Sequence, residues 1–250
     1  MVTLVFFIFR GEPFTASLIS AFSSAVAVFL SWAVGRELDP AHKWSAFIAL
    51  PVIYITFFTA GRPSLLVLFF LILCCRVLNR TCGLQPLKSD ALLLLVLAIL
   101  LYLNNFYFAL PYLILLFLID ALAKPANRFQ YISALISSAA YLIMLLAFRP
   151  ELTLFINQNI PAIYPAAAVT LVFISAIYIS YTTRHDRVID DLNIEELNFQ
   201  RVNAARLLTA AWIVIEILCG GVIILLQVYP VVFIYGGILT YHLDGLFKRA

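Results

Sequence analysis

The ionisable residues with the clearest chemical potential gather in a short segment after the first apolar run of the chain. Within residues 35–43 the ionisable side chains are Arg36, Glu37, Asp39, His42 and Lys43. An arginine guanidinium can bind a phosphate through two parallel hydrogen bonds, and carboxylates can share a Mg²⁺ ion with phosphate oxygens. This combination of residue types favours a site for an anionic headgroup or a nucleotide.

A second polar segment, residues 76–90, and an aspartate that ends a later apolar run offer the same chemistry. The complete candidate site comprises Arg36, Glu37, Asp39, His42, Arg80, Lys88, Asp90 and Asp120. We expect most of these side chains to converge on one concave site near the cytoplasmic membrane surface. A different interpretation needs no site, because basic residues accumulate on the cytoplasmic side of multi-pass proteins and form local ion pairs.

One acidic residue, Glu216, lies near the middle of an apolar run at residues 207–228, with a pair of glycines one turn later. A charge at the bilayer centre costs on the order of 2.5–3.5 kcal/mol on insertion scales, so such residues usually face a cavity or a polar partner. We expect Glu216 to point into the protein. Two roles are then open for Glu216. It is part of a proton or substrate pathway, or it is a neutral acid that forms a hydrogen bond to a neighbouring helix.

The cysteines show no metal-ligand spacing. Cys74 and Cys75 are adjacent in one apolar run, Cys219 lies in another, and Cys82 lies in a polar loop. The sequence also contains no Walker loop, nucleophile elbow or dinucleotide fingerprint. We therefore predict no metal site, and Mg²⁺ enters as a cofactor only if the cytoplasmic carboxylates bind a phosphate.

Long apolar segments must position these residues. Hydrophobic residues make up 64% of the 250 residues and charged residues only 12%, about half of the roughly 25% typical of soluble domains. Apolar runs of about 18 residues can cross the hydrocarbon core as helices, which satisfy their own backbone hydrogen bonds. The predicted fold class is an all-α, polytopic transmembrane helix bundle.

We expect about nine spans in one integral membrane domain that covers residues 1–250. The spans are residues 15–34, 44–60, 63–78, 90–104, 106–123, 129–148, 161–181, 207–228 and 230–247. With alternating sides, three lysines and arginines fall on one side and thirteen on the other. The positive-inside rule makes the richer side cytoplasmic, so the N-terminus lies outside and the C-terminus inside. This topology requires a turn at Asn104 and Asn105.

The longest polar stretch, residues 182–206, is expected to be a short cytoplasmic connector. Four apolar residues of this stretch fall on one face of a helix: Val188, Leu192, Phe199 and Val202. A helix lying on the membrane and a solvated connector are equally compatible with this pattern.

Three functions remain open for a multi-pass protein of the cell membrane with lipid as a partner. The preferred one is an enzyme or binder that acts on a phosphate-bearing lipid or isoprenoid at the cytoplasmic face. The second is a secondary transporter with Glu216 as its coupling residue, and the third is a non-catalytic assembly subunit. The net charge of +3 is too small to suggest a nucleic-acid partner.

Overall fold

A computed structural model describes residues 2–9, 11, 13–42, 44–81, 85–123, 126–148, 163–182 and 198–247. All regular structure in these ranges is helical, which confirms the predicted all-α class. The helices are α1 Val2–Phe9, α2 Phe14–Leu38, α3 Ser45–Ile48, α4 Leu50–Ala60, α5 Leu65–Asn79, α6 Lys88–Leu103, α7 Ala109–Leu122, α8 Phe129–Phe148, α9 Ile163–Thr182 and α10 Phe199–Phe247.

Four helices are long and apolar enough to cross a membrane: α2, α8, most of α9, and α10. Shorter apolar helices accompany them at Ser45–Ala60, Leu65–Asn79 and Ala109–Leu122. Large apolar side chains cover the outside of the bundle, and Phe22, Leu135 and Leu146 are 72%, 71% and 76% exposed. A surface of this kind is unfavourable in water, so it indicates a protein whose outer faces contact lipid.

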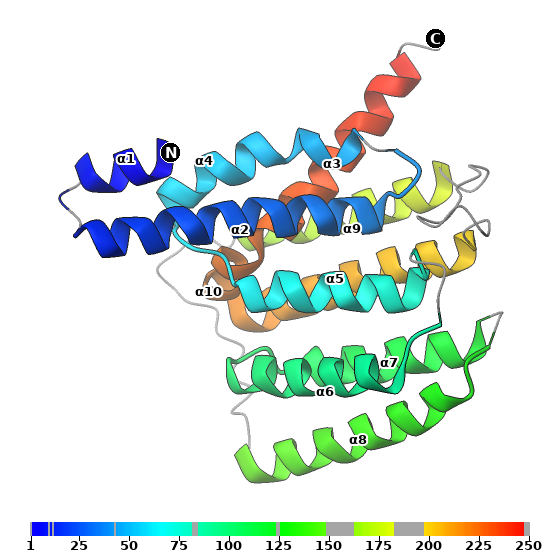
Figure 1. Cartoon of the computed structure of the whole chain (residues 1–250). Coiled ribbons are helices and arrows are strands. Elements are labelled where there is room, and N and C mark those ends of the chain that lie inside the picture. The colour runs from blue at the N-terminus through cyan, green and yellow to red at the C-terminus, as the bar shows by residue number, and fades with distance from the viewer. Residues whose placement is uncertain are drawn as a thin grey trace.

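From α4 to α8, successive helices run in opposite directions through the bundle, whereas α3 and α4 follow one another in the same direction (Figure 1). One end, on the right of Figure 1, gathers the C-terminal ends of α2, α5 and α7 and the first residues of α6, α8 and α10. We call this the polar end, because the buried residues Asp39, Arg80, Asp120, Arg201 and Arg206 lie there. Helix α5 packs against α2, α6, α7 and α10, and α10 packs against α2, α3, α4, α5, α7 and α9.

The boundaries of α10 correct the sequence prediction. Helix α10 begins at Phe199, inside the stretch expected to be a connector, and Val202 of the predicted interfacial face is buried within the bundle. Val188 and Leu192 of that face lie outside the described residues. The predicted break between residues 228 and 230 is also wrong. The helix continues through Pro230, and its backbone leaves helical geometry instead at Gly221, where φ is +61°. Glycine tolerates this conformation because it has no Cβ.

The predicted turn at Asn104 and Asn105 is present. Helix α6 ends at Leu103 and α7 starts at Ala109, and Asn105 adopts a φ of +69°. Asparagine is among the few residues that enter this left-handed region readily. The turn therefore converts one long apolar stretch into two antiparallel helices that lie side by side (Figure 1).

Two glycines let the short helix α3 pack closely against α2 and α10. A Cβ on Gly35 would lie 3.0 Å from the Cβ of Ala46, and a Cβ on Gly237 would lie 3.0 Å from the backbone nitrogen of Ala49. Small residues at helix contacts permit such close approach of backbones. As a result, the turn between α2 and α3 is held against the last part of α10.

Candidate functional site

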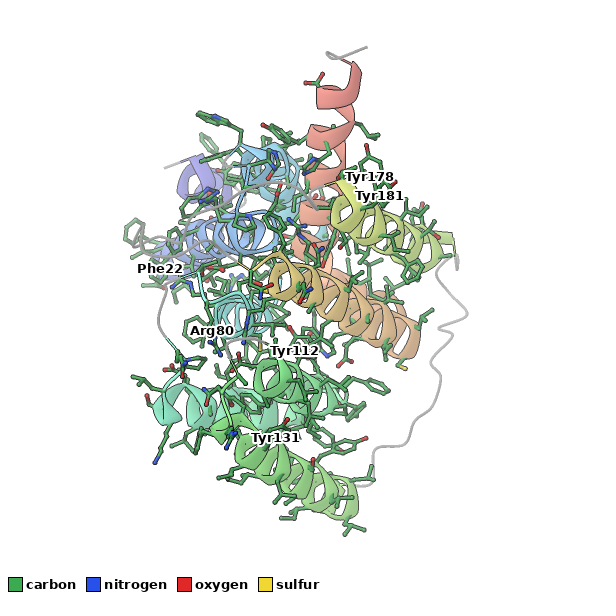
Figure 2. All side chains as sticks on the ribbon, turned by 90° about the vertical axis from the view of Figure 1, so that its right-hand side faces the viewer. Phe22, Arg80, Tyr112, Tyr131, Tyr178 and Tyr181 are labelled. Carbon is green, nitrogen blue, oxygen red and sulfur yellow. The ribbon has the colours of Figure 1, made fainter. Side chains whose placement is uncertain are left out.

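The first buried charge cluster surrounds Asp120, which is fully buried near the end of α7. Its Oδ1 accepts a hydrogen bond of 3.0 Å from Nη2 of Arg80, at the end of α5, and another from Nη1 of Arg201, in the first turn of α10. We call these three residues the Asp120 cluster. Figure 2 looks onto the polar end and labels Arg80 within it. Two guanidinium groups therefore meet one carboxylate away from water.

Several buried polar atoms of this region have no hydrogen-bond partner in the described part of the chain. They are Nε and Nη1 of Arg80, Oδ2 of Asp120 and both amide atoms of Gln130. Gln130 is fully buried in the first turn of α8, at the same end of the α7–α8 hairpin as Asp120. Buried polar groups are normally satisfied, so atoms left over in one region point to a ligand or to water.

The backbone of Arg80 also marks this region. Arg80 ends α5 in the left-handed conformation with a φ of +55°, and its N–H bonds the carbonyl of Arg76. Helices commonly end with glycine in this conformation, because a Cβ is unfavourable there. The chain instead carries an arginine whose side chain is directed into the protein and is only 8% exposed. The residue type at this position is therefore explained by the Arg80 side chain, which bonds Asp120, and not by the backbone conformation.

The second cluster surrounds Asp39, the residue that ends α2 and is also fully buried. Its Oδ1 lies 3.1 Å from Nδ1 of His42 and 3.3 Å from Nη2 of Arg206, and its Oδ2 lies 3.2 Å from Nε2 of His242. The two imidazole rings meet edge to face with centroids 4.7 Å apart. We call these four residues the Asp39 cluster.

The charge state of Asp39 follows from its partners. Burial alone would raise the pKa of this carboxyl group. Hydrogen bonds from His242 and His42 and the positive charge of Arg206 outweigh burial, and together they hold its pKa below the ordinary value. Asp39 is therefore a carboxylate at neutral pH.

Arg201 and Arg206 bind the C-terminal ends of three helices. Arg201 donates to the carbonyl of Leu78 in α5 at 3.2 Å and to that of Ala123 after α7 at 2.7 Å, and Arg206 donates through Nε to the carbonyl of Leu38 in α2. The last carbonyls of a helix lack partners within it, and cations are favoured there by the helix dipole. These two arginines thus fix the polar end.

Glu37 joins α2 to α5 within the same end. Its carboxylate accepts hydrogen bonds from Nε of Arg76 at 3.0 Å and from the hydroxyl of Thr81 at 2.9 Å, and its backbone carbonyl accepts one from Asn79. Glu37 is buried, whereas the side chain of Arg76 is 48% exposed. The pair therefore lies at the edge of the polar end.

The other predicted site residues have local contacts. Arg36 donates to the carbonyl of Pro40 at 3.2 Å. Asp90 accepts a hydrogen bond from the backbone N–H of Leu87 at 2.8 Å and so caps α6, and Lys88 lies over the ring of Phe129. Among the predicted site residues, Arg80 bonds Asp120 directly and His42 bonds Asp39 directly. The two aspartates are bonded to different arginines of α10.

Apolar side chains of α5 and α6 line a pocket of about 370 Å³ beside this end. Leu73, Val77, Leu93 and Leu94 contribute to its walls, and Arg76 and Asp90 are the charged residues that line it. A pocket with apolar walls and a few polar groups suits a ligand with an apolar part and a polar head.

Glu216 lies inside the bundle at 1% exposure. Its Oε1 accepts hydrogen bonds of 2.9 Å from the backbone N–H of Phe108 and from the indole N–H of Trp212. Phe108 directly precedes α7, so the carboxyl group caps the start of that helix. This geometry gives Glu216 a structural task.

Comparison of the chain with protein-family models, with curated proteins and with solved structures finds no match. The chemistry of the polar end is therefore derived from its own residues and their geometry.

Proposed function

We propose that the chain crosses the cell membrane about nine times, with its N-terminus outside and the polar end and C-terminus in the cytoplasm. Alternating helix directions and the excess of thirteen over three basic residues on one side support this topology. Reporter fusions after Asn105 and after Ala250 are expected to lie on opposite sides. Fusions that report the same side would contradict the topology.

We further propose that the protein binds the phosphate group of an anionic lipid or isoprenoid at the polar end. The observation that carries this proposal is Arg80, with two buried N–H groups that lack a partner in the described chain. Asp120 already receives a second guanidinium from Arg201, so among the described residues two guanidinium charges meet one carboxylate charge. A phosphate would balance the second guanidinium charge and accept charge-assisted hydrogen bonds from Arg80.

The adjacent pocket supports a lipid over a nucleotide. Its apolar walls on α5 and α6 suit an acyl or isoprenoid chain, and its charged residues include Arg76, one helical turn before Arg80. In this proposal Asp120 orients the two arginines, Arg201 holds the helix ends, and Arg80 is the phosphate ligand. Gln130 offers a further amide group at the same end.

Binding can be tested with the purified full chain in detergent by native mass spectrometry. Phosphatidic acid and farnesyl phosphate are the two phosphate-bearing probes, and phosphatidylcholine is the zwitterionic control. The test variant is Arg80→Gln, and the matched control is Arg128→Gln, which removes an exposed charge on the same side. Arg80→Gln is expected to fold, because Asp120 retains Arg201.

We expect Arg80→Gln to weaken binding about tenfold to hundredfold, since a hydrogen bond to a charged group contributes about 1.5–3 kcal/mol. Arg128→Gln should change binding less than about twofold, as expected for an exposed charge. Equal weakening by both variants would indicate nonspecific surface attraction. Unchanged binding in Arg80→Gln would remove the proposed site. Preference between the two phosphate probes distinguishes an acyl lipid from an isoprenoid.

A further inference from the structure

A second binding site is suggested by side chains that the sequence did not connect. Asp39 and His42 follow α2, whereas His242 lies 203 residues after Asp39, near the end of α10. Each of the three residues offers one ligand atom, and these atoms lie within 4.8 Å of one another. We propose that Asp39, His42 and His242 bind one transition-metal ion of the zinc class at the polar end.

The distances fit such an ion. In a tetrahedral zinc site the bonds to nitrogen and oxygen are about 2.0–2.2 Å, which places two ligand atoms roughly 3.4 Å apart. Oδ1 of Asp39 lies 3.1 Å from Nδ1 of His42, and Oδ2 lies 3.2 Å from Nε2 of His242. One carboxylate oxygen and the two imidazole nitrogens lie within 4.8 Å of one another, somewhat wider than in a formed site. A metal ion would replace the two hydrogen bonds between these groups after small side-chain movements.

The surroundings already orient the ligands. Arg206 bonds Oδ1 of Asp39, and Tyr241 packs beside both imidazole rings at centroid distances of 5.4 and 5.7 Å. Behind them, the close contacts of Gly35 with Ala46 and of Gly237 with Ala49 hold the turn against α10. Groups that bond a ligating side chain from behind fix its orientation and strengthen metal binding.

The donor set selects the class of metal. Two imidazoles and one carboxylate suit Zn²⁺, Co²⁺, Ni²⁺ and Cu²⁺, whereas Mg²⁺ and Ca²⁺ prefer oxygen ligands. The positive charge of Arg206 offsets the negative charge of Asp39. This further disfavours Mg²⁺ and Ca²⁺, which are held mainly by negatively charged oxygen ligands. Three protein ligands also leave the fourth tetrahedral position for water or another ligand, as in catalytic zinc sites. The side chain of His42 is 27% exposed, so this position can be reached from the polar end.

Cobalt provides the direct test, because its visible absorption reports tetrahedral coordination by nitrogen and oxygen ligands. The full chain is purified in detergent without a histidine tag, stripped with a chelator and titrated with Co²⁺, followed by Zn²⁺ competition and metal analysis. The variants are His42→Ala and His242→Ala. The matched control is His185→Ala, which changes the one histidine of the sequence that is not a proposed ligand.

We expect one Co²⁺ per chain, displaced by Zn²⁺ and not by Mg²⁺. His42→Ala and His242→Ala should each weaken binding more than about tenfold, while His185→Ala leaves it unchanged. Circular dichroism verifies that each variant keeps its helices. A chain that binds no Co²⁺ above the detergent background, or one whose binding survives both ligand variants, would overturn the site. Arg80→Gln should bind Co²⁺ normally, which separates this proposal from the phosphate site.

Discussion

Asp39 and Asp120 are two buried carboxylates at the same end of the bundle, and each is bonded to an arginine from the first turns of α10. Their remaining partners differ. Asp120 receives a second arginine, and N–H groups are left over around it. Asp39 receives two histidines, and both of its oxygens are bonded. One cluster therefore pairs two guanidinium groups with one carboxylate, and the other has closely spaced metal-ligating atoms.

The difference shows how the same pair, a buried aspartate bonded to an arginine of α10, can take part in two different kinds of binding site. Arg201 and Arg206 satisfy the last carbonyls of α2, α5 and α7, which fixes the helix ends. The remaining partners of each aspartate, Arg80 at Asp120 and the two histidines at Asp39, then determine which ligand each cluster can bind. A second guanidinium suits a phosphate, while imidazoles suit a transition metal.

The largest expected effect follows removal of the carboxylate charges. Asp120→Asn removes the carboxylate that two buried guanidinium groups share, and breaking a buried ion pair costs about 3–5 kcal/mol. Asp39→Asn removes the carboxylate bonded to one buried guanidinium, that of Arg206, whose hydrogen bonds to Leu38 and Asn203 remain, so we expect about 1–3 kcal/mol. The measurement is unfolding in mixed micelles of increasing SDS content, followed by circular dichroism.

Asp90→Asn is the matched control for these two variants, because it removes a carboxylate from an exposed helix cap where asparagine is equally suitable. Its effect should be within about 0.5 kcal/mol. If Asp39→Asn is as destabilising as Asp120→Asn, the proposed charge difference between the clusters is wrong.

A third carboxyl group, Glu216, sharpens the comparison because its two hydrogen-bond donors at Phe108 and Trp212 are neutral. Glu216→Ala leaves both donors unsatisfied and should cost about 1–3 kcal/mol. Glu216→Gln retains an acceptor oxygen and should cost less than about 1 kcal/mol in the same SDS titration. A glutamine variant as unstable as the alanine variant would show that an amide oxygen cannot replace the carboxyl group as the acceptor for Phe108 and Trp212.

The smallest effect concerns the contact that positions the Asp39 cluster. Gly237→Ala puts a Cβ 3.0 Å from the backbone of Ala49, whereas Gly236→Ala puts one 3.3 Å from the flexible end of Leu171. Alanine gains about 1 kcal/mol in helix propensity at both positions. We expect Gly236→Ala to be neutral or stabilising, and Gly237→Ala to lose about 1 kcal/mol net through overpacking.

Gly237→Ala should also weaken Co²⁺ binding in the titration described above, while Gly236→Ala leaves it unchanged. Equal behaviour of the two variants in stability and in Co²⁺ affinity would show that the close contact with Ala49 does not position the cluster.

The sequence predicts the helical class well, because long apolar runs that cross a membrane must form helices to satisfy their backbone hydrogen bonds. The turn at Asn104 and Asn105 was also predictable, since it was needed to keep the basic residues on one side. The start of α10 was not, because Arg201 and Arg206 are charged residues buried inside a helix bundle. Their burial depends on carbonyl groups from α2, α5 and α7, and no local pattern encodes those partners.

The candidate site was predicted in part. Arg80, Asp120, Asp39 and His42 were singled out, but the pairing among them depends on which helix ends meet. His242 and Gln130 were missed, because a lone histidine or glutamine near the end of an apolar run carries no distinguishing spacing. Their neighbours are set by tertiary contacts, such as the one between Gly237 and Ala49.

An experimental structure of the full chain with bound phosphatidic acid tests the central claim most directly. We predict a phosphate oxygen within about 2.7–3.2 Å of Nε or Nη1 of Arg80, with Asp120 still bonded to Arg201 and the acyl chain between α5 and α6. A phosphate held only by exposed residues such as Arg128, with the N–H groups of Arg80 bonded to water or protein, would contradict the account.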